Sequence, residues 1–353
     1  MKLSEKTGIS ELLKLKSDWK RLSGDSKYSY NPFIEFERII ASIEYQNENN
    51  LITYIAYNEK DEIVAIVPFV FRKVYSIYKI AYLAGAEFAD YNDLLIMDSY
   101  EEIISLIFEK ILHRCNLVYI KNIAAIGCLY NNIERIDTNN VYFKIYKKNI
   151  SPIIILSTKW VNFPENLKKS LKYDIKYNLR RLKSIGDLDF TVLKNYDSQY
   201  ELLNVLFDLH KKEWHLKGQE SIFDKTDVCE YYRKIIKDMQ YSNASIVFMK
   251  LELNHNVIAL VFGFQKNDRY FYYKPVYNPE YKKYSPGKIM LSYVIEYCLS
   301  NNIEIVDMLR GMEEYKSLWA NDHIELYDLL SGRRSIMILP VIKYLQKRYM
   351  RPR

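Results

Sequence analysis

The sequence predicts an α+β protein of two domains, each built on a mixed, mainly antiparallel sheet flanked by helices. The chain has 353 residues, 49% of them hydrophobic, so it can bury one or two substantial cores. Strand patterns recur in both halves, and helical patterns lie between them. One basic amphipathic segment at 164–186 separates the two halves.

The first half begins with helical patterns and continues with strands. The segments 51–58 and 62–71 alternate or run apolar on either side of Glu59-Lys60-Asp61, which predicts an antiparallel hairpin. Further strands are expected within 87–97 and at 116–124, and helices at 12–22, 33–45 and 101–115. These elements predict an α+β domain over residues 1–150.

The segment 164–186 predicts a single amphipathic helix. Its apolar residues recur every three or four positions, at Leu167, Leu171, Ile175, Leu179 and Leu182. Gly186 is a plausible C-terminal cap. Basic residues surround the apolar stripe: Lys168, Lys169, Lys172, Lys176, Arg180, Arg181 and Lys183, with Asp174 among them. Two interpretations stay open, a solvated basic face and a face that contacts an anion.

The second half changes to the order strand, two helices, three antiparallel strands, helix, strand, short helix and strand. The expected elements lie at 188–194, 199–216, 229–239, 244–252, 256–265, 269–276, 285–302, 303–309, 313–320 and 324–330. This is the order of elements in the GNAT fold. We therefore expect a connecting strand and the basic helix at 151–186, a second domain at 187–335, and a basic tail at 336–353.

Composition limits the compartment and the partners. The net charge of +7, from 51 basic and 44 acidic residues, suits an anionic ligand and does not demand nucleic acid. The four cysteines are far apart, so neither a zinc site nor a disulfide framework is indicated. No apolar run reaches about 18 residues, and the N-terminus has no signal-peptide core. These features predict a cytoplasmic protein without a membrane span.

Four blocks of the second half carry a resemblance to a known family. They are LKKSLKYDIKYNLRRLKSIGDLDF, LFDLHKKEWHLKGQESIF, RYFYYKPVYNPEYKKYSPGK and VDMLRGMEEYKSLWA, in this order within 164–330. The chain resembles GNAT acetyltransferases of the CelD/BcsL type, which are related to FemAB peptidyltransferases. IVPFVF and LAGAEFADYNDLLIM extend the similarity more thinly into the first half. The chain departs from the family's pattern at Asn278 and Met312, and these departures bear on which molecule accepts the acyl group.

The resemblance implies two tandem GNAT-like domains, of which the C-terminal one is catalytic. It also implies acetyl-CoA or another acyl-CoA as co-substrate, bound by its pyrophosphate where a loop enters a helix, and no metal. The turn Ser285, Pro286, Gly287 and Lys288 suits pyrophosphate binding, because it offers a cap or donor, a first-turn proline, an approachable backbone and a positive charge. Taken alone, Ser-Pro-Gly is a common helix start.

A second cluster follows the strand at 303–309. Amide formation needs a deprotonated amine, a polarised thioester carbonyl and a protonated leaving thiolate. We expect Asp307 to act as the base or to orient the amine, with Glu314 as second choice and Tyr315 as acid or carbonyl donor, while Arg310 and Lys316 hold an anionic acceptor. Trp319 lies in the same cluster. The alternative is that Asp307 with Arg310, and Glu314 with Lys316, are structural ion pairs.

Two further residues are weaker candidates. His210 is a potential general base near neutral pH, although a single helical histidine is more often structural. Tyr273 is a potential substrate contact, although alternate tyrosines on a strand usually pack across it. The expected reaction is N-acyl transfer to a small or nucleotide-linked sugar precursor of a cell-surface polysaccharide. The rivals are an aminoacyl-tRNA-dependent amide ligase and a non-catalytic module in peripheral contact with a membrane; the oligomeric state is open.

Overall fold

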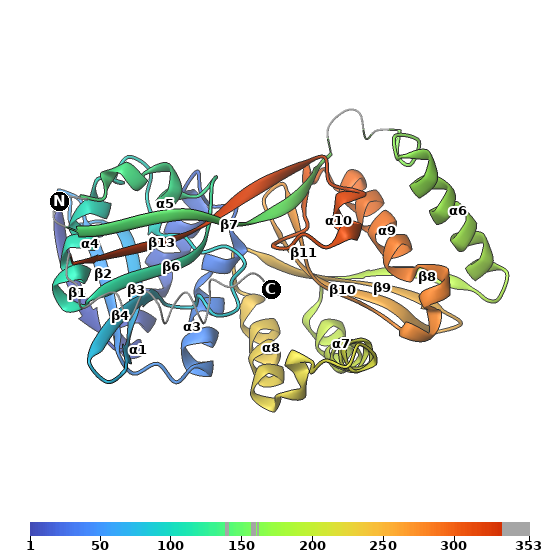
Figure 1. Ribbon diagram of the computed structural model, residues 1–353, viewed down its shortest axis with the longest axis horizontal. Helices are drawn as coiled ribbons and strands as arrows, with labels where there is room; N and C mark the ends of the chain where they lie inside the picture. The colour runs from blue at the N-terminus through green and yellow to red at the C-terminus, as the bar shows by residue number, and fades with distance from the viewer. Residues whose placement is uncertain (138–140, 157–159, 161, 334–353) are drawn as a thin grey trace. The chain divides into compact units, whose positions relative to one another are not determined.

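A computed structural model describes residues 1–137, 141–156, 160 and 162–333, which form two compact units (Figure 1). The first unit holds Met1–Ile150 and the segment that starts at Ile324, and the second unit holds Ser151–His323. The strand at 324–330 was expected in the second domain. The structure places this strand in the first unit, because it pairs with a strand there. The predicted basic tail at 336–353 lies outside the described residues.

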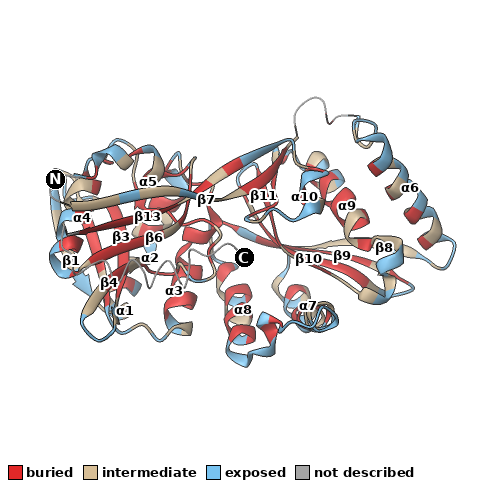
Figure 2. Ribbon diagram, in the orientation of Figure 1, coloured by how far each residue is buried: buried red, intermediate tan, exposed pale blue. Residues whose placement is uncertain are grey.

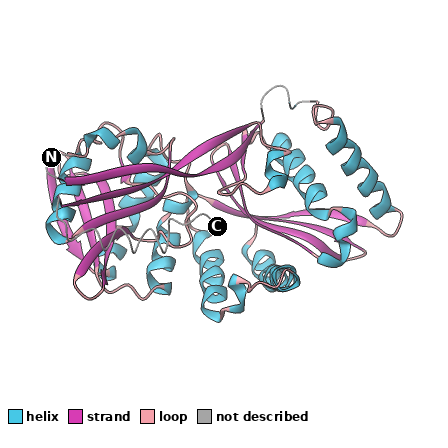
Figure 3. Ribbon diagram, viewed as in Figure 1, coloured by secondary structure: helices cyan, strands magenta, loops and turns pink. Residues whose placement is uncertain are grey.

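The first unit is a mixed sheet with helices on both faces (Figure 3). Its strand order is β1-β2-β3-β4-β6-β13-β7, with β5 paired to β3. The strands are β1 (Lys2–Thr7), β2 (Leu51–Tyr57), β3 (Ile63–Val74), β4 (Tyr78–Leu83), β5 (Leu95–Ile96), β6 (Leu117–Ala124), β7 (Val141–Ile155) and β13 (Asp322–Arg333). The helices are α1 (Ile9–Leu13), α2 (Lys16–Asp25), α3 (Phe36–Tyr45), α4 (Ile103–Arg114) and α5 (Cys128–Asn131), with short 3₁₀ turns η1 (Pro32–Ile34) and η2 (Ile133–Arg135).

The second unit continues from β7 with the strand order β7-β12-β11-β10-β9-β8. Its strands are β8 (Leu188–Leu193), β9 (Ser245–Leu253), β10 (Asn256–Lys266), β11 (Arg269–Tyr277) and β12 (Ile305–Asp307). Its helices are α6 (Lys169–Lys183), α7 (Tyr196–Leu216), α8 (Thr226–Met239), α9 (Pro286–Ser300) and α10 (Glu314–Ser317), with 3₁₀ turns η4 (Ile222–Asp224) and η5 (Pro279–Tyr284). Helix α9 covers one face of this sheet, and α7 and α8 cover the other (Figure 1).

The two units repeat one plan. In each, three antiparallel strands are followed by one parallel pair, β4 with β6 in the first unit and β11 with β12 in the second. The strand beside the parallel pair comes from elsewhere in the chain: β13 lies next to β6, and the end of β7 pairs with β12. The predicted fold class, two GNAT-like domains with mixed, mainly antiparallel sheets, is therefore confirmed.

Alternation along the strands explains where the cores lie (Figure 2). In β3, Val67 and Phe69 belong to the core under α4, whereas Ile66 and Val70 belong to the core under α2 and α3. Successive strand residues face opposite sides, so an apolar run such as this one belongs to a strand covered on both faces. The predicted stripe of α6 is also buried, with Leu171, Ile175 and Leu182 in the core beneath α9.

One expected strand differs from the structure. The segment 87–97 contains only the two-residue strand β5, and the residues before it form turns. Polar side chains there serve other contacts: Asn92 donates to the carbonyl of Lys121 at 2.8 Å, and Asp93 accepts from the backbone of Cys128 and Leu129. Tertiary hydrogen bonds therefore replace the regular ladder that the apolar pattern suggested.

Candidate functional site

The parallel pairing in the second unit ends partway along β11. Strand β12 pairs with β11 only from Arg269–Ile305 to Phe271–Asp307, whereas β11 continues to Tyr277. Beyond Phe271, β12 supplies no partner strand within the described residues. Backbone groups on such an edge must find other partners, so this edge is suited to contact an extended ligand.

A β-bulge lies at the same point. Phe262 of β10 stands opposite Lys274, but Phe264 stands opposite Phe271, so Gly263 faces two residues of β11 instead of one. A bulge bends a strand and re-aims its side chains. The ring of Tyr273 packs on Phe262 and Phe264, so Tyr273 lies on the face covered by α7 and α8. Lys274 pairs with Phe262 and therefore lies on that face as well.

Gly263 is required by its surroundings. A Cβ at this position would lie 2.2 Å from Oη of Tyr270 and 2.7 Å from the carbonyl oxygen of Phe271. The Tyr270 ring is fully buried on the face opposite Tyr273, beneath α9. The bulge and the glycine thus belong together: the ring of Tyr270 occupies the space that a larger residue in β10 would need.

The chain leaves β11 through η5 and enters α9 at the predicted SPGK turn. Ser285 is the N-cap residue in a left-handed conformation, with φ 51°, and its hydroxyl makes no capping hydrogen bond. Nothing lies within 4 Å of the position a Cβ would take on Gly287, so its backbone can be approached. Lys288 is held by Asp174 of α6, with Nζ 2.5 Å from Oδ2. The helix start therefore presents an open glycine beside a lysine whose position is fixed.

The corresponding helix of the first unit begins differently. Helix α4 follows Glu101 and Glu102, and Glu102 is its N-cap residue. Glu101 pairs with Lys27 at 3.1 Å. Two carboxylates at a helix N-terminus complement the helix dipole themselves and repel other anions. Of the two repeated positions, the start of α9 is the one suited to an anionic ligand.

Asp307 is fully buried and engaged in the protein. One carboxylate oxygen accepts from Nη1 of Arg269 at 3.1 Å, and the other accepts from the backbone N–H of Leu309 at 3.0 Å. The predicted role of Asp307 as the base does not fit this geometry, because its side chain has no exposed surface and both of its carboxylate oxygens are already hydrogen-bonded. It holds the turn after β12, where Leu309 has a φ of 58°.

Lys316 is buried as well. Its Nζ donates to the carbonyl oxygens of Leu309 and Arg310, both at 3.1 Å, and pairs with Glu313 at 2.9 Å. The predicted role in holding an anionic acceptor does not fit, because all its donors serve the turn. Trp319 is also buried in the core. Arg310 and Glu314, in contrast, are exposed.

Tyr315, the predicted acid or carbonyl donor, lies on α10. It packs against the core beneath α9, and burial, with the carboxylates of Glu313 and Glu213, raises the pKa of its phenol. Tyr315 is therefore protonated at neutral pH and can donate a hydrogen bond. Tyr315 also lies near Tyr272 of β11, because its phenol contributes to the raised pKa of Tyr272 after burial, and so it lies near the strand edge described above.

Glu213 of α7 is a residue that the sequence pattern did not single out. Its carboxylate is mostly buried, with 17% of the side chain exposed, and pairs with Lys217 at 2.7 Å. It is close enough to raise the pKa of both Tyr277 and Tyr315, although burial is the larger cause in each. The available signal was its place in the block that contains His210 and Trp214. The neighbouring lysines instead suggested a surface residue.

His210 is held in one orientation by two neighbours. Its ring stacks on Trp214, with centroids 5.4 Å apart, and its Nδ1 lies 2.8 Å from Oγ of Ser221. That oxygen also accepts from the backbone N–H of Phe223 at 3.0 Å. Among the described residues, the acceptor left for the Ser221 hydroxyl proton is Nδ1, which assigns the ring proton to Nε2.

The charge state of His210 follows from its environment. Burial, followed by the charges of Lys274 and Lys217, lowers the pKa of His210 to about 4. The ring is therefore neutral at pH 7 and offers an N–H donor from Nε2, which fits a positioning group better than the predicted general base. Tyr273 is buried nearby, and its hydroxyl lies 3.1 Å from that of Tyr232.

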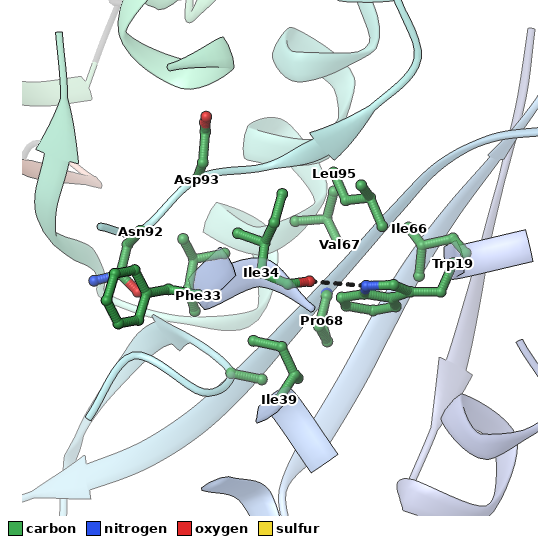
Figure 4. A pocket seen from close by; sticks show the side chains of 12 residues that line it. Trp19, Phe33, Ile34, Ile39, Ile66, Val67, Pro68, Asn92, Asp93 and Leu95 are labelled. Carbon is green, nitrogen blue, oxygen red and sulfur yellow. Dashed lines mark hydrogen bonds between the residues drawn. The ribbon is translucent and has the colours of Figure 1, made fainter. Parts of the chain in front are cut away.

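The first unit has a small cavity between α2, η1 and β3, with a volume of about 20 Å³ (Figure 4). Its wall includes Trp19, whose Nε1 donates to the carbonyl of Ile34 at 2.9 Å, and Asp93. A space of this size holds about one water molecule and no larger ligand. Asp93 caps α5, and its complete burial raises the pKa of its carboxyl to about 6.

Neither a cluster of potential metal ligands nor a helix suited to cross a membrane occurs in the part of the chain that the structure describes. These residues contain no group of three His, Cys, Asp or Glu side chains that could hold a metal ion. Within the same ranges, no helix has the length and the apolar character needed to cross a bilayer.

Comparison with known proteins finds one family model that matches part of the chain and several solved structures with a similar fold. Residues 169–317 match the model described as "Acetyltransferase (GNAT) domain". No curated protein matches the chain. Among solved structures, FemX superposes with a TM-score of 0.62 at 9% identity, covering 93% of this chain and 97% of that chain. A conserved protein of unknown function from Bacteroides thetaiotaomicron gives 0.60 at 12% identity, covering 91% and 97%.

A third structure, L-PGS from Bacillus licheniformis, gives a TM-score of 0.57 at 14% identity and covers 100% of both chains. At these identities the likeness shows the fold alone. The family match adds evidence from the second unit's own sequence: residues 169–317, which include α6, β11 and the start of α9, match a GNAT acetyltransferase domain.

Proposed function

We propose that the second unit transfers an acyl group from acyl-CoA to an amine of a small or nucleotide-linked sugar precursor of a cell-surface polysaccharide. One observation carries the proposal: β11 loses its β12 partner after Phe271, bulges, and leads through η5 into the open helix start at Gly287. An extended donor with an anionic head needs these two features in one place, an unpaired strand edge and free helix N–H groups.

The start of α9 would hold the pyrophosphate of the donor. Gly287 lets the phosphates approach the backbone, and the helix dipole favours their charge. Lys288 adds a cation that Asp174 keeps in place. The acidic start of α4 disfavours the same role in the first unit, so the donor is assigned to the second unit alone.

Three side chains would serve the chemistry. We assign Glu213 as the base that takes the proton from the attacking amine, and Tyr315 as the donor to the sulfur as the C–S bond breaks. His210 would position the acceptor through its Nε2–H. The amine nitrogen forms the new C–N bond, and the proton that it loses balances the one that the free thiol gains.

The rival donor is aminoacyl-tRNA. Its support is the fold shared with FemX and the seven basic residues of 164–186. Both donors present an acyl group on a phosphate-bearing carrier, so the helix start alone does not separate them. The open Gly287 favours a compact pyrophosphate, because it offers close backbone contact at one point.

Calorimetric titration tests the proposal with acetyl-CoA and, in parallel, with aminoacylated tRNA. Acetyl-CoA should bind, and Gly287→Val should weaken that binding at least about tenfold by filling the approach to the backbone. Ser300→Val, at the exposed other end of α9, is the matched control and should leave affinity unchanged. Binding of tRNA without acetyl-CoA would replace the proposal with the ligase.

A further inference from the structure

The solvent side of α6 has a consistent chemical character. Helix α6 contains both buried and exposed residues (Figure 2). Leu171, Ile175 and Leu182 are buried, whereas its exposed residues include cations and tyrosines. Tyr173 and Tyr177 are 64% and 44% exposed, which is unusual for large aromatic rings. We call this surface the α6 outer face; it consists of Lys169, Tyr173, Lys176, Tyr177, Arg180 and Lys183, all exposed.

The segment that contains α6 is strongly basic. Residues 164–186 include seven basic and two acidic residues, which gives this segment a net charge of +5. Both acids are already used, Asp174 by Lys288 and Glu165 by Lys172 and Lys176. Within the described ranges, Lys169, Arg180 and Lys183 have no carboxylate within ion-pair distance. The α6 outer face is therefore complementary to an extended anion.

The tyrosines are arranged in a way that limits what they can bind. The rings of Tyr173 and Tyr177 are stacked, 6.0 Å apart with an interplanar angle of 9°. The guanidinium of Arg181 lies over Tyr177 at 5.3 Å and over Tyr284 at 4.6 Å. Tyr173 and Arg181 lie one helical turn before and after Tyr177, so they cover the two faces of its ring. The edge and hydroxyl of Tyr177 remain for an outside partner, and a nucleobase cannot stack on its ring faces.

We propose that the α6 outer face docks the protein on an anionic lipid surface. A helix of 15 residues is about 22 Å long, so its cations form a straight row that can contact several lipid phosphates at once. Tyrosine edges and hydroxyls suit the headgroup region, where amphipathic rings concentrate. Nucleic acid is the less suitable partner, because Tyr173 and Arg181 already cover the two ring faces of Tyr177.

The contact would be peripheral and reversible. The apolar stripe of α6 stays in the core beneath α9, so no large apolar surface is available to enter the bilayer. The helix is also fixed to the start of α9, through Asp174 with Lys288 and through Arg181, whose Nη1 donates to the carbonyl of Lys283 at 3.0 Å. Docking would thus bring the helix start at Gly287 close to the lipid headgroups.

Sedimentation with vesicles tests this inference and does not depend on the proposed chemistry. The full chain should bind vesicles containing about one third phosphatidylglycerol and should not bind pure phosphatidylcholine vesicles. The triple variant K169E/K176E/R180E should bind about a hundredfold more weakly, since each basic residue near an anionic surface contributes measurably. Binding should also decrease as salt increases.

A matched triple variant controls for net charge. K212E/K225E/K237E changes the same number of exposed charges on the α7 and α8 side of the unit and should bind vesicles like the wild type. If both triple variants weakened vesicle binding equally, overall charge alone would explain the effect, and the inference would be overturned. Binding of tRNA at physiological salt without binding of vesicles would overturn it as well. The melting temperatures of both variants confirm folding.

Discussion

His210 and Asp93 are both buried titratable residues, yet burial moves their pKa values in opposite directions. Desolvation disfavours the charged form of each, so it lowers the pKa of the imidazole to about 4 and raises that of the carboxyl to about 6. Each side chain also has hydrogen-bond partners. Ser221 gives His210 a proton to accept at Nδ1, and three backbone N–H groups contact the carboxylate of Asp93.

The tautomer of His210 can be measured directly. Nitrogen-15 spectra of the imidazole at pH 7 should show the proton on Nε2 in the wild type. Ser221→Ala removes the hydroxyl that donates to Nδ1, so the two tautomers should then mix. His215 pairs with Asp224 and serves as the internal control. A proton on Nδ1 in the wild type would contradict the assignment of His210 as an Nε2–H donor.

Glu213→Gln tests the proposed base. It should lower kcat by about a hundredfold or more while KM for the donor and the melting temperature change little, because the amide keeps the shape of the side chain. The measurement is thiol release from acetyl-CoA with an amine acceptor. Glu220→Gln, at an exposed position beyond the same helix, is the control. An unchanged kcat would remove Glu213 from the mechanism.

The candidate site could be predicted from the sequence only where local chemistry decides it. Ser285, Pro286 and Gly287 form the expected helix start because proline and glycine act on their own backbone. The roles of Asp307 and Lys316 depend on partners distant in sequence or on an unusual turn, such as Arg269 and the left-handed Leu309. Glu213 could not be identified from the sequence, because only folding brings it near Tyr277 and Tyr315. The spacing of residue types along the sequence does not show which charged residues become buried in the fold.

At the scale of elements, glycines of the second unit differ in how much room surrounds them. Gly263→Ala should lower the free energy of unfolding by about 2 kcal/mol or more, because its Cβ would meet Tyr270 and the carbonyl of Phe271. Gly287→Ala should change it by less than about 0.5 kcal/mol, since the space there is open. Urea unfolding measures both.

A second substitution identifies the cause. The hydroxyl of Tyr270 is buried without a hydrogen-bond partner in the described structure, so Tyr270→Phe should be close to neutral by itself. Combined with Gly263→Ala, it should recover part of the lost stability, because the nearest clash is with that oxygen. Strict additivity of the two changes would mean that Tyr270 is not the obstacle.

Elements with a clear period were predictable, and those defined by distant partners were not. The hairpin of β2 and β3, the helix α6 and the run from β9 to α9 appear where hydrophobic spacing placed them. Strand β7 begins at Val141, well before the expected connecting strand. The strand expected within 87–97 is limited to Leu95–Ile96. Sequence spacing also cannot show that β13 pairs with β6. The paired residues, such as Leu117 and Gly332, are separated along the sequence by the whole second unit.

For the whole molecule, the two buried titratable groups predict that acid affects the units in opposite ways. His210 has a lowered pKa in the folded state, so its unit is most stable above about pH 6.5 and loses stability as pH falls toward 4. Asp93 has a raised pKa, so its contribution is largest near pH 4 and declines as pH rises through 6. Each effect is on the order of 2 kcal/mol.

Scanning calorimetry at pH 4.5 and 6.5 measures this separation. The transition of the second unit should move to lower temperature in acid relative to that of the first unit. Asp93→Asn and His210→Gln assign the transitions, because each should abolish the pH response of one unit only. If both transitions moved together in the wild type and in both variants, neither group would control the response.

The origin of β13 has a consequence for how the protein is made. A ribosome delivers residues 1–150 first, but the sheet that they build remains incomplete until Asp322–Arg333 has been synthesised. Among the described residues, the second unit, Ser151–His323, takes no strand from later in the chain, so it can fold while the first unit still has β6 exposed at an open edge. The usual order, in which the N-terminal part matures first, is reversed in this chain. Nascent chains halted before residue 322 should recruit chaperones through that edge, and those released after residue 333 should not.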